Sequence, residues 1–396
     1  MRLYRTTTYA VLDALKQIFE DKKYADKVIE KVLKQNPKWG ARDRRFIAET
    51  TYDIVRWYRL LKFVTNTEDN NYWKLVGAWC ALNEHEIPDW DEFKEVNRKQ
   101  ILKRYEEARQ SIADFESIPD WLHQQGEQEL GRVWPEELKA LNEEAVVVLR
   151  TNTLKINRKE LILALAEQEV ETDINPGYKD AIILKRRQNV FLLPEFKEGL
   201  FEVQDAGSQA IAPFLQAEPG MRVIDACAGG GGKSLHLAAL MENKGKIISM
   251  DTEEWKLNEL KLRARRAGVG NIEIRWIENT KTIKRLDKAA DRVLLDVPCS
   301  GLGVLKRNPD AKWKLTPEFI ENVKRVQAGI LHDYATMVKP GGKLVYSTCS
   351  IMPSENENLV ENFLKHNSDF AIEEERMIWP SQGFDGFYMA RFNRKS

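Results

Sequence analysis

The stretch Asp296-Val-Pro-Cys-Ser-Gly-Leu-Gly303 follows the apolar run Arg292-Val-Leu-Leu295 and ends in glycines. Such a run is typical of a buried parallel strand, and the glycines indicate a loop that begins where the strand stops. Asp296 and Cys299 are therefore expected at the carboxyl end of a strand. In an open α/β sheet this is the edge at which ligands bind.

A second run, Lys343-Leu-Val-Tyr-Ser-Thr348, brings another cysteine, Cys349, to the end of another expected strand. Free cysteine is among the most buried residue types, so either cysteine alone would be read as an inert core residue. Two cysteines at strand ends, together with a glycine-rich loop upstream of both, predict instead a site with two thiols.

From residue 221 onward, strand-like and helix-like segments alternate. The expected strands are 222–226, 246–250, 271–277, 292–295 and 343–348, and the expected helices are 233–241, 253–267 and 317–338. Alternating β and α units predict a mostly parallel, doubly wound α/β sheet of the Rossmann-like kind. The tail 386–392 alternates in polarity and is expected to end the sheet as an antiparallel strand.

Two further modules are expected before this α/β domain, which we assign to residues 213–396. Residues 1–116 show helical apolar periodicity and no constellation of catalytic groups, which predicts an all-helical interaction, RNA-positioning or scaffold domain. Residues 117–212 mix both patterns and predict a small α+β module. Its expected elements are strands at 145–150, 181–184 and 190–193 and a helix at 159–168.

Composition limits what the chain can be. With 61 basic and 61 acidic residues the formal net charge is zero, so nucleic-acid binding would have to rely on local patches. The four cysteines show no CxxC spacing and no histidine cluster, so no metal site is expected. No apolar run approaches membrane-spanning length and the N-terminus lacks an apolar signal region. We expect a cytoplasmic monomer with free thiols.

The loop Asp225-Ala-Cys-Ala-Gly-Gly-Gly-Gly-Lys-Ser234 joins the first expected strand of the α/β domain to its first helix. A phosphate-binding P-loop would need glycine where this chain has Cys227. The dinucleotide pattern GxGxxG also fails, because Ser234 or Leu235 stands where its third glycine belongs. Asp251, at the end of the next strand, can accept both hydrogen bonds of a ribose diol. S-adenosyl-L-methionine, which has a ribose but no phosphates, fits this combination.

Several motifs follow one another along the chain. They are Cys227-Ala-Gly-Gly-Gly-Gly-Lys233, Asp296-Val-Pro-Cys-Ser-Gly301, Asn308-Pro-Asp-Ala-Lys-Trp313, Gly341-Gly-Lys-Leu-Val-Tyr-Ser-Thr-Cys-Ser350 and Glu355-Asn356-Glu357. In this order they resemble the RNA (cytosine-5) methyltransferases of the RsmB/Sun type. The resemblance extends upstream through 201–209 and, more weakly, into a NusB-like helical domain. It covers nearly the whole chain.

The resemblance implies a methyltransferase that uses S-adenosyl-L-methionine to methylate carbon 5 of cytosine in RNA. The residues expected to bind the cofactor are Cys227, Ala228, Gly229, Gly230, Gly231, Gly232, Lys233, Asp251, Glu278 and Asp296. Two positions depart from the family pattern. Gly230 stands where the family usually has proline, and Glu278-Asn279 stands where it tends to have an aspartate. Of these two residues we favour Glu278 as the acid on the adenosine side.

Two thiols suit this chemistry because carbon 5 of cytosine is a poor nucleophile until a thiolate adds to carbon 6. Spacing does not say which cysteine attacks. DNA (cytosine-5) methyltransferases use the Pro-Cys thiol, which corresponds to Cys299. The resemblance to the RNA family instead assigns the nucleophile to Cys349 and product release to Cys299. Basic side chains on the loop after Cys299 are expected either to contact RNA or to be merely exposed; they are Lys306, Arg307 and Lys312.

The combination of helical and catalytic modules favours 16S ribosomal RNA over transfer RNA as substrate, by analogy with the family. Two other classes remain open. A non-catalytic RNA-binding assembly factor would have no need of both cysteines. A methyltransferase acting on DNA or a small molecule would leave the two upstream modules unexplained.

Overall fold

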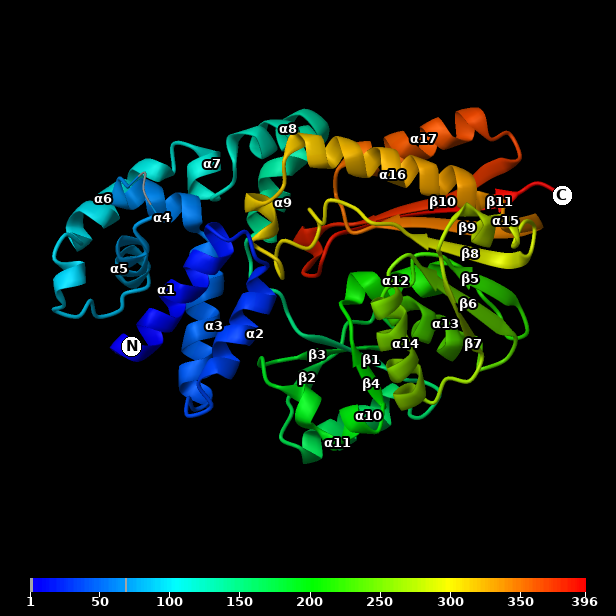
Figure 1. Cartoon of the computed structure of the whole chain (residues 1–396), viewed down its shortest axis with the longest axis horizontal. Coiled ribbons are helices and arrows are strands. Elements are labelled where there is room, and N and C mark those ends of the chain that lie inside the picture. The colour runs from blue at the N-terminus through cyan, green and yellow to red at the C-terminus, as the bar shows by residue number, and fades with distance from the viewer. Residues whose placement is uncertain (1–2, 68–69) are drawn as a thin grey trace. The chain divides into compact units, whose positions relative to one another are not determined.

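The computed structural model describes residues 3–67 and 70–396 (Figure 1). The chain divides into two compact units. The first comprises residues 1–143 together with the distant segment 305–317, and the second comprises 144–304 and 318–396. Within the described ranges, no helix combines the length and the apolar character needed to cross a membrane.

The first unit is built from helices, and its described residues contain no strand. Its helices are α1 (Arg5–Phe19), α2 (Ala25–Gln35), α3 (Ala41–Arg56), α4 (Tyr58–Thr65), α5 (Tyr72–Leu82), α6 (Arg98–Ala108), α7 (Ile112–Phe115), α8 (Asp120–Leu130) and α9 (Trp134–Leu141). In α2 the buried residues are Ala25, Val28, Ile29 and Val32, which is the spacing of one helix face. Faces of this kind from α1 to α6 form one apolar core.

The segment 305–317 belongs to this helical unit although it lies far along the chain. The indole Nε1 of Trp313 donates to the carbonyl oxygen of Val55 at 2.7 Å, and its ring packs against the helical core. The carboxylate of Asp310 accepts a hydrogen bond from the backbone N–H of Ala25, the first residue of α2. The loop that follows the Cys299 motif is therefore fixed by residues from the start of the chain.

The second unit begins with a four-stranded antiparallel sheet in the order β2-β3-β1-β4. Its elements are β1 (Val148–Thr151), α10 (Arg158–Glu167), β2 (Thr172–Asp173), β3 (Ala181–Leu184), α11 (Pro194–Lys197) and β4 (Phe201–Val203). The strand expected at 190–193 is wrong, because Val190–Leu192 is a 3-10 turn. The side chain of Asn189 accepts from the Phe191 N–H, and Pro194 follows, so the run turns instead of extending.

The rest of the second unit is a seven-stranded sheet in the order β10-β11-β9-β8-β5-β6-β7. Its strands are β5 (Arg222–Asp225), β6 (Lys246–Asp251), β7 (Ile272–Trp276), β8 (Ala290–Asp296), β9 (Val338–Thr348), β10 (Phe370–Ile378) and β11 (Phe387–Arg394). The strands β5 to β9 pair in parallel, which confirms the predicted doubly wound domain. Its helices are α12 (Ala206–Phe214), α13 (Gly232–Leu240), α14 (Glu254–Ala267), α15 (Thr280–Lys284), α16 (Pro317–Ala335) and α17 (Glu357–His366).

The tail forms the expected antiparallel strand, β11, but β11 is not the edge of the sheet. It lies between β9 and β10, and β10 is the outer strand. The sequence pattern missed β10 because its middle carries the charged run Glu373 to Arg376, which gives no apolar alternation. Charged residues of this kind are common on edge strands, where they discourage pairing with another chain.

Candidate active site

Four parallel strands end at one edge of the large sheet with side chains that the sequence singled out. β5 ends at Asp225, β6 at Asp251 and β8 at Asp296, and β9 ends at Thr348, directly before Cys349. These strands are neighbours in the order β6-β5-β8-β9 and run in the same direction. The fold therefore gathers a glycine loop, three carboxylates and a thiol at one edge of the sheet, whose strands can be followed in Figure 1.

The glycine-rich loop between β5 and α13 depends on Gly231. Its φ is +85°, and a Cβ there would come within 2.5 Å of the Leu260 Cγ, so a side chain is excluded on both counts. No side chain of the described residues caps the N-terminus of α13. The first N–H groups of such a helix attract an anion, and the carboxylate of S-adenosyl-L-methionine is one that fits.

Gly230, where the family usually has proline, is held from outside the loop. Its carbonyl oxygen accepts a hydrogen bond from the Nη1 of Arg263 on α14 at 2.8 Å. A Cβ at position 230 would lie 3.1 Å from the same nitrogen. The rigidity that proline would give this position is thus partly replaced by the contact with Arg263.

Asp225 lies beneath the loop and not in it. Its carboxylate is fully buried and accepts a hydrogen bond from the Ser234 hydroxyl at 2.6 Å. Burial raises the pKa of Asp225 to about 7. Cys227 packs against the apolar core of the sheet, and burial raises the pKa of its thiol as well. Ala228 is buried against α14, so the glycines are the open part of this loop.

Asp251, expected to bind the ribose, supports the glycine loop. Its two carboxylate oxygens accept one hydrogen bond each, from the N–H of Gly229 and from the N–H of Glu253, both at 2.9 Å. A carboxylate has about four acceptor positions, so two remain for a diol. Asp251 can therefore fix the loop and hold a ribose at the same time.

A cavity of about 490 Å³ lies beyond the ends of β6 and β7. Glu278 and Asn279 both line it, as do apolar and aromatic side chains such as Ile277 and Tyr334. Asn279 caps the N-terminus of α15, because its side chain accepts a hydrogen bond from the Lys281 N–H. Glu278 and Asp333 are the acids in this wall, and the apolar surface beside Glu278 suits a flat adenine ring.

Lys233 and Asp296 connect the glycine loop to the loop after β8. The Lys233 Nζ lies 2.5 Å from the Asp296 Oδ2, and the Ser347 hydroxyl donates to Oδ1 of the same carboxylate at 3.1 Å. Burial lowers the pKa of Lys233, but the Asp296 carboxylate outweighs it, and the pKa lies above its ordinary value. Lys233 is therefore a fixed positive charge at the centre of the site.

The sulfur atoms of Cys299 and Cys349 lie 2.9 Å apart, on two loops separated by fifty residues of chain. This exceeds the length of a disulfide bond, about 2.0 Å, and both thiols are free. The Cys299 sulfur also accepts from the Cys349 N–H at 3.3 Å. The contact with Cys349, together with burial, raises the pKa of Cys299 well above its ordinary value. Both thiols are partly exposed.

Glu355 is the residue whose role the sequence did not reveal. This fully buried carboxylate accepts from the Ser300 N–H at 2.9 Å and from the hydroxyls of Ser300 and Ser350 at 2.5 and 2.6 Å. Gln327 on α16 donates to it as well. Ser300 follows Cys299 and Ser350 follows Cys349, so one carboxylate fixes both cysteine loops. The motif Glu355-Asn356-Glu357 was the available signal.

The loop lysines expected as RNA contacts are not on the surface. The side chain of Lys312 is buried, and its Nζ donates to the Asn142 Oδ1 at 3.0 Å. Lys306 is buried too, and its Nζ lies 3.1 Å from the Glu143 carboxylate. The expectation that Lys306 and Lys312 either contact RNA or are merely exposed is wrong. Both side chains are buried, and their contacts hold segment 305–317 in the helical unit. Among the described residues, no group of three side chains could hold a metal ion.

Comparison with protein-family models gives two matches. The model described as 16S rRNA methyltransferase RsmB/F matches residues 212–393. A second, described as the RsmF/B-like methyltransferase ferredoxin-like domain, matches residues 118–191. The first covers the seven-stranded sheet and its site, and the second covers most of the four-stranded sheet.

Curated relatives and solved structures agree with these matches. A Synechocystis protein named probable ribosomal RNA small subunit methyltransferase B is 33% identical, and the alignment covers 91% of this chain and 89% of the relative. A Bacillus subtilis protein of the same name is 27% identical over 91% and 88%. The crystal structure of PH0851 has a TM-score of 0.83 at 25% identity, with full coverage of both chains. A methyltransferase homolog from Pyrococcus horikoshii has a TM-score of 0.61 at 29% identity, covering 68% and 93%.

Proposed function

The chain belongs to the RsmB/F family of 16S ribosomal RNA methyltransferases, and from this premise we propose that it methylates carbon 5 of a cytosine in small-subunit ribosomal RNA through a covalent cysteine adduct. The observation that carries the proposal is the pair of thiols, Cys299 and Cys349, 2.9 Å apart at the carboxyl edge of the sheet. Methylation at a base nitrogen or at a ribose oxygen needs no thiol. Methylation at carbon 5 through an adduct needs one to attack and a base to complete the reaction.

The covalent route needs a methyl donor, a thiol that attacks and a base that completes the reaction. A thiolate adds to carbon 6, which makes carbon 5 nucleophilic. Bound S-adenosyl-L-methionine supplies the methyl group that carbon 5 then takes. A base removes the proton from carbon 5, and the bond between sulfur and carbon 6 breaks to release the cysteine. The target base must leave any stack to reach the two thiols.

We assign the attack to Cys349. The Lys233 ammonium interacts electrostatically with Cys349, and a neighbouring cation is typical of a nucleophilic cysteine. The contact with Cys349, together with burial, raises the pKa of the Cys299 thiol and so keeps it protonated. A protonated thiol is a poor nucleophile, which leaves the attack to Cys349. Cys299 is accordingly assigned to product release.

The cofactor is assigned to the edge between the glycine loop and β7. The carboxylate of S-adenosyl-L-methionine would lie at the N-terminus of α13, its ribose at Asp251 and its adenine in the cavity beside Glu278. Asp296 lies between the cofactor side and the thiol side, joined to Lys233. Its remaining acceptor capacity can meet either the cofactor or the exocyclic amine of cytosine.

The family and the names of the relatives favour small-subunit ribosomal RNA as the substrate. The helical unit, in which the sequence resembles NusB, would then act as the module that positions this RNA. The alternatives are transfer RNA as substrate and a non-catalytic assembly factor. Bisulfite sequencing of ribosomal and transfer RNA from cells with and without the gene tests all three. One protected cytosine in 16S ribosomal RNA that depends on the gene is expected, and no gene-dependent site in either RNA would contradict the proposal.

A further inference from the structure

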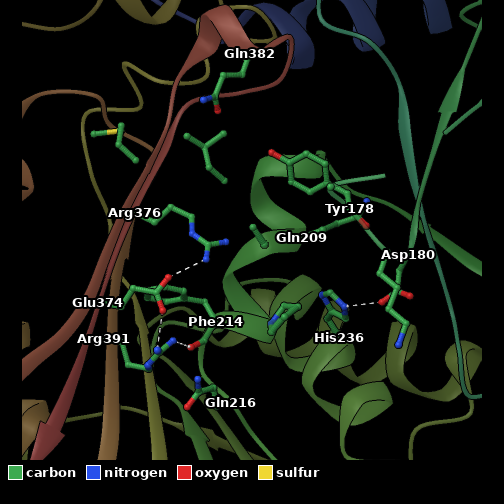
Figure 2. A pocket seen from close by; sticks show the side chains of 16 residues that line it. Tyr178, Asp180, Gln209, Phe214, Gln216, His236, Glu374, Arg376, Gln382 and Arg391 are labelled. Atoms are coloured by element: carbon green, nitrogen blue, oxygen red, sulfur yellow. Dashed lines mark hydrogen bonds and ion pairs between the residues drawn. The ribbon is translucent and has the colours of Figure 1, made fainter. Parts of the chain in front are cut away.

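A second cavity, of about 600 Å³, lies in the second unit and shares no residue with the site described above. Its walls come from the loop 177–180 of the small module, from α12 and α13, and from β10 with the turn that follows it. Figure 2 shows His236 and Asp180 on one side, Arg376 and Glu374 on the other, and Gln209 between them. The volume lies in the range of pockets that hold small molecules, about 300–1,000 Å³.

His236, which lines this cavity, has an unpaired acceptor buried beside it. Its Nε2 lies 3.2 Å from the Asp180 Oδ2, and its side chain is almost fully buried. Burial lowers the pKa of His236 to about 4, so the ring is neutral at pH 7. The carboxylate can only accept, so the single ring proton is on Nε2, and Nδ1 is a bare acceptor. Among the described residues this nitrogen has no hydrogen-bond partner.

Gln209, which also lines the cavity, has a second buried and unpaired acceptor. Its Nε2 donates to the backbone oxygens of Gln204 and Leu149, at 2.9 and 3.4 Å. Because both partners are acceptors, the amide cannot be turned around, and Oε1 must face away from them. This oxygen is buried and has no partner within the described part of the chain. Unpaired buried acceptors are costly, and a ligand with N–H donors would satisfy them.

The other side of the cavity carries an ion pair, in which the Arg376 Nη2 donates to the Glu374 Oε1 at 2.8 Å. The guanidinium of Arg376 lies 5.3 Å from the centre of the Phe214 ring and is half-exposed. Lys179 is exposed at the rim. Arg391 is buried, and its guanidinium is committed to Glu373, Glu374 and a backbone oxygen, so it is part of the wall. The cavity is thus lined by two residues with buried, unpaired acceptors, by the Phe214 ring, and by two cations, of which Arg376 is paired with Glu374 and Lys179 is exposed.

We propose that this cavity binds one unpaired nucleotide of the RNA substrate, outside the target cytosine, with an exocyclic amine of the base directed to Gln209 and His236 and the phosphate towards Arg376 and Lys179. The inference rests on the proposed function for the identity of the polymer as RNA. Unstacked bases are commonly bound by their edges and stacked on aromatic or guanidinium planes. The pocket would recognise sequence beside the target and add to the affinity for RNA.

The test uses the full chain and two labelled RNA octamers that differ only in the exocyclic amine, one of adenosine and one of purine riboside. Fluorescence anisotropy without cofactor is expected to show about fivefold tighter binding of the adenosine octamer, the effect of one hydrogen bond. The variant His236→Phe removes the acceptor and should abolish this preference. The variant Arg376→Ala should weaken binding of both octamers by about tenfold. Equal affinity of the wild-type chain for both octamers would overturn the proposal.

Controls separate this pocket from other causes. Lys365→Ala removes an exposed cation at the far end of α17 and should leave both affinities unchanged. Calorimetry should show unaltered S-adenosyl-L-methionine binding in Arg376→Ala, and thermal melting checks that His236→Phe is folded. If His236→Phe does not fold, an Arg376→Ala variant with wild-type affinity for both octamers would still overturn the proposal.

Two further readouts identify the ligand. Free AMP should give no binding at micromolar concentration, and tight AMP binding that Arg376→Ala abolishes without affecting the octamers would overturn the assignment to RNA. Methylation is measured separately. A chain that shows the octamer preference but modifies no ribosomal RNA would contradict the proposed function and leave the pocket supported. Methylation of ribosomal RNA without the octamer preference would support the proposed function and contradict the proposal for the pocket.

Discussion

Glu355 and Ser300 are joined by two hydrogen bonds, because the carboxylate accepts from both the backbone N–H and the hydroxyl of the serine. Ser300 follows Cys299 directly, and a third bond from Ser350 ties the loop of Cys349 to the same carboxylate. The two cysteine loops are therefore tied together by a residue that bonds to neither thiol, in addition to the direct bond from the Cys349 N–H to the Cys299 sulfur. Four predictions follow from this site.

The first prediction concerns Glu355 as a positioning residue. Glu355→Ala leaves at least four buried donors without their acceptor, at a cost of about 1–3 kcal/mol for each such group. We expect a lower melting temperature and a loss of kcat of about a hundredfold, with S-adenosyl-L-methionine affinity within twofold of wild type. Calorimetry measures the melting temperature and the S-adenosyl-L-methionine affinity, and a methylation assay measures kcat. Glu361→Ala, an exposed change on α17, should alter neither. Wild-type kcat in a folded Glu355→Ala variant would contradict the prediction.

The second prediction separates the two thiols. If Cys349 attacks carbon 6, Cys349→Ala abolishes both turnover and the protein–RNA adduct. If Cys299 serves release, Cys299→Ala still permits attack and methyl transfer, and the adduct accumulates. A denaturing gel of both variants with cofactor and RNA distinguishes these results. An adduct from Cys349→Ala would reverse our assignment, and two active variants would mean that the thiols only pack.

The third prediction concerns Asp251. Asp251→Ala should weaken S-adenosyl-L-methionine binding by about 1.5–3 kcal/mol, the range for hydrogen bonds to a charged group. Part of the loss should come from the glycine loop, because the N–H of Gly229 also loses its partner. Isothermal calorimetry measures the affinity, and Glu242→Ala, an exposed change, is the control. Unchanged affinity in a folded Asp251→Ala variant would remove Asp251 from the cofactor site.

The fourth prediction concerns stability and pH. The pKa of Asp225 is raised by burial to about 7 in the folded chain, against 3.8 for the ordinary side chain. The folded state therefore holds this proton more tightly, and the contribution of Asp225 to stability falls as the pH rises from about 4 to about 7. Asp225→Asn removes this dependence. The melting temperature of the variant minus that of the wild type should be larger at pH 8 than at pH 5. An equal difference at both pH values would contradict the assignment.

The main lines of the catalytic domain could be predicted because its signals are local. A buried parallel strand needs an apolar run, and the runs before Asp296 and Cys349 predicted β8 and β9 and the edge at which they end. The glycine loop could be recognised from its spacing alone. The strand expected at 190–193 failed because the side chain of Asn189 and the proline at 194 favour a turn over an extended chain.

The remaining features depend on residues that are far apart in sequence. Lys312 looked like a surface cation because lysine is almost never fully buried unless paired. Its partner, Asn142, lies 170 residues away. Glu355 likewise acquires its role only when two loops meet, so no periodicity could reveal it. The cavity beside His236 requires Asp180 from the small module, 56 residues upstream.

The segment 305–317 also has a consequence for synthesis on the ribosome. The helical unit is completed by Trp313 and Asp310, which bind Val55 and the start of α2, yet roughly 160 residues separate its first part from this segment. At about 5–20 residues per second, the ribosome takes roughly 8–30 s to make them. During that time residues 1–143 lack the piece that covers Val55. The nascent chain therefore cannot finish its first domain before most of its second has been translated, and a chaperone would meet an N-terminal domain that is still incomplete.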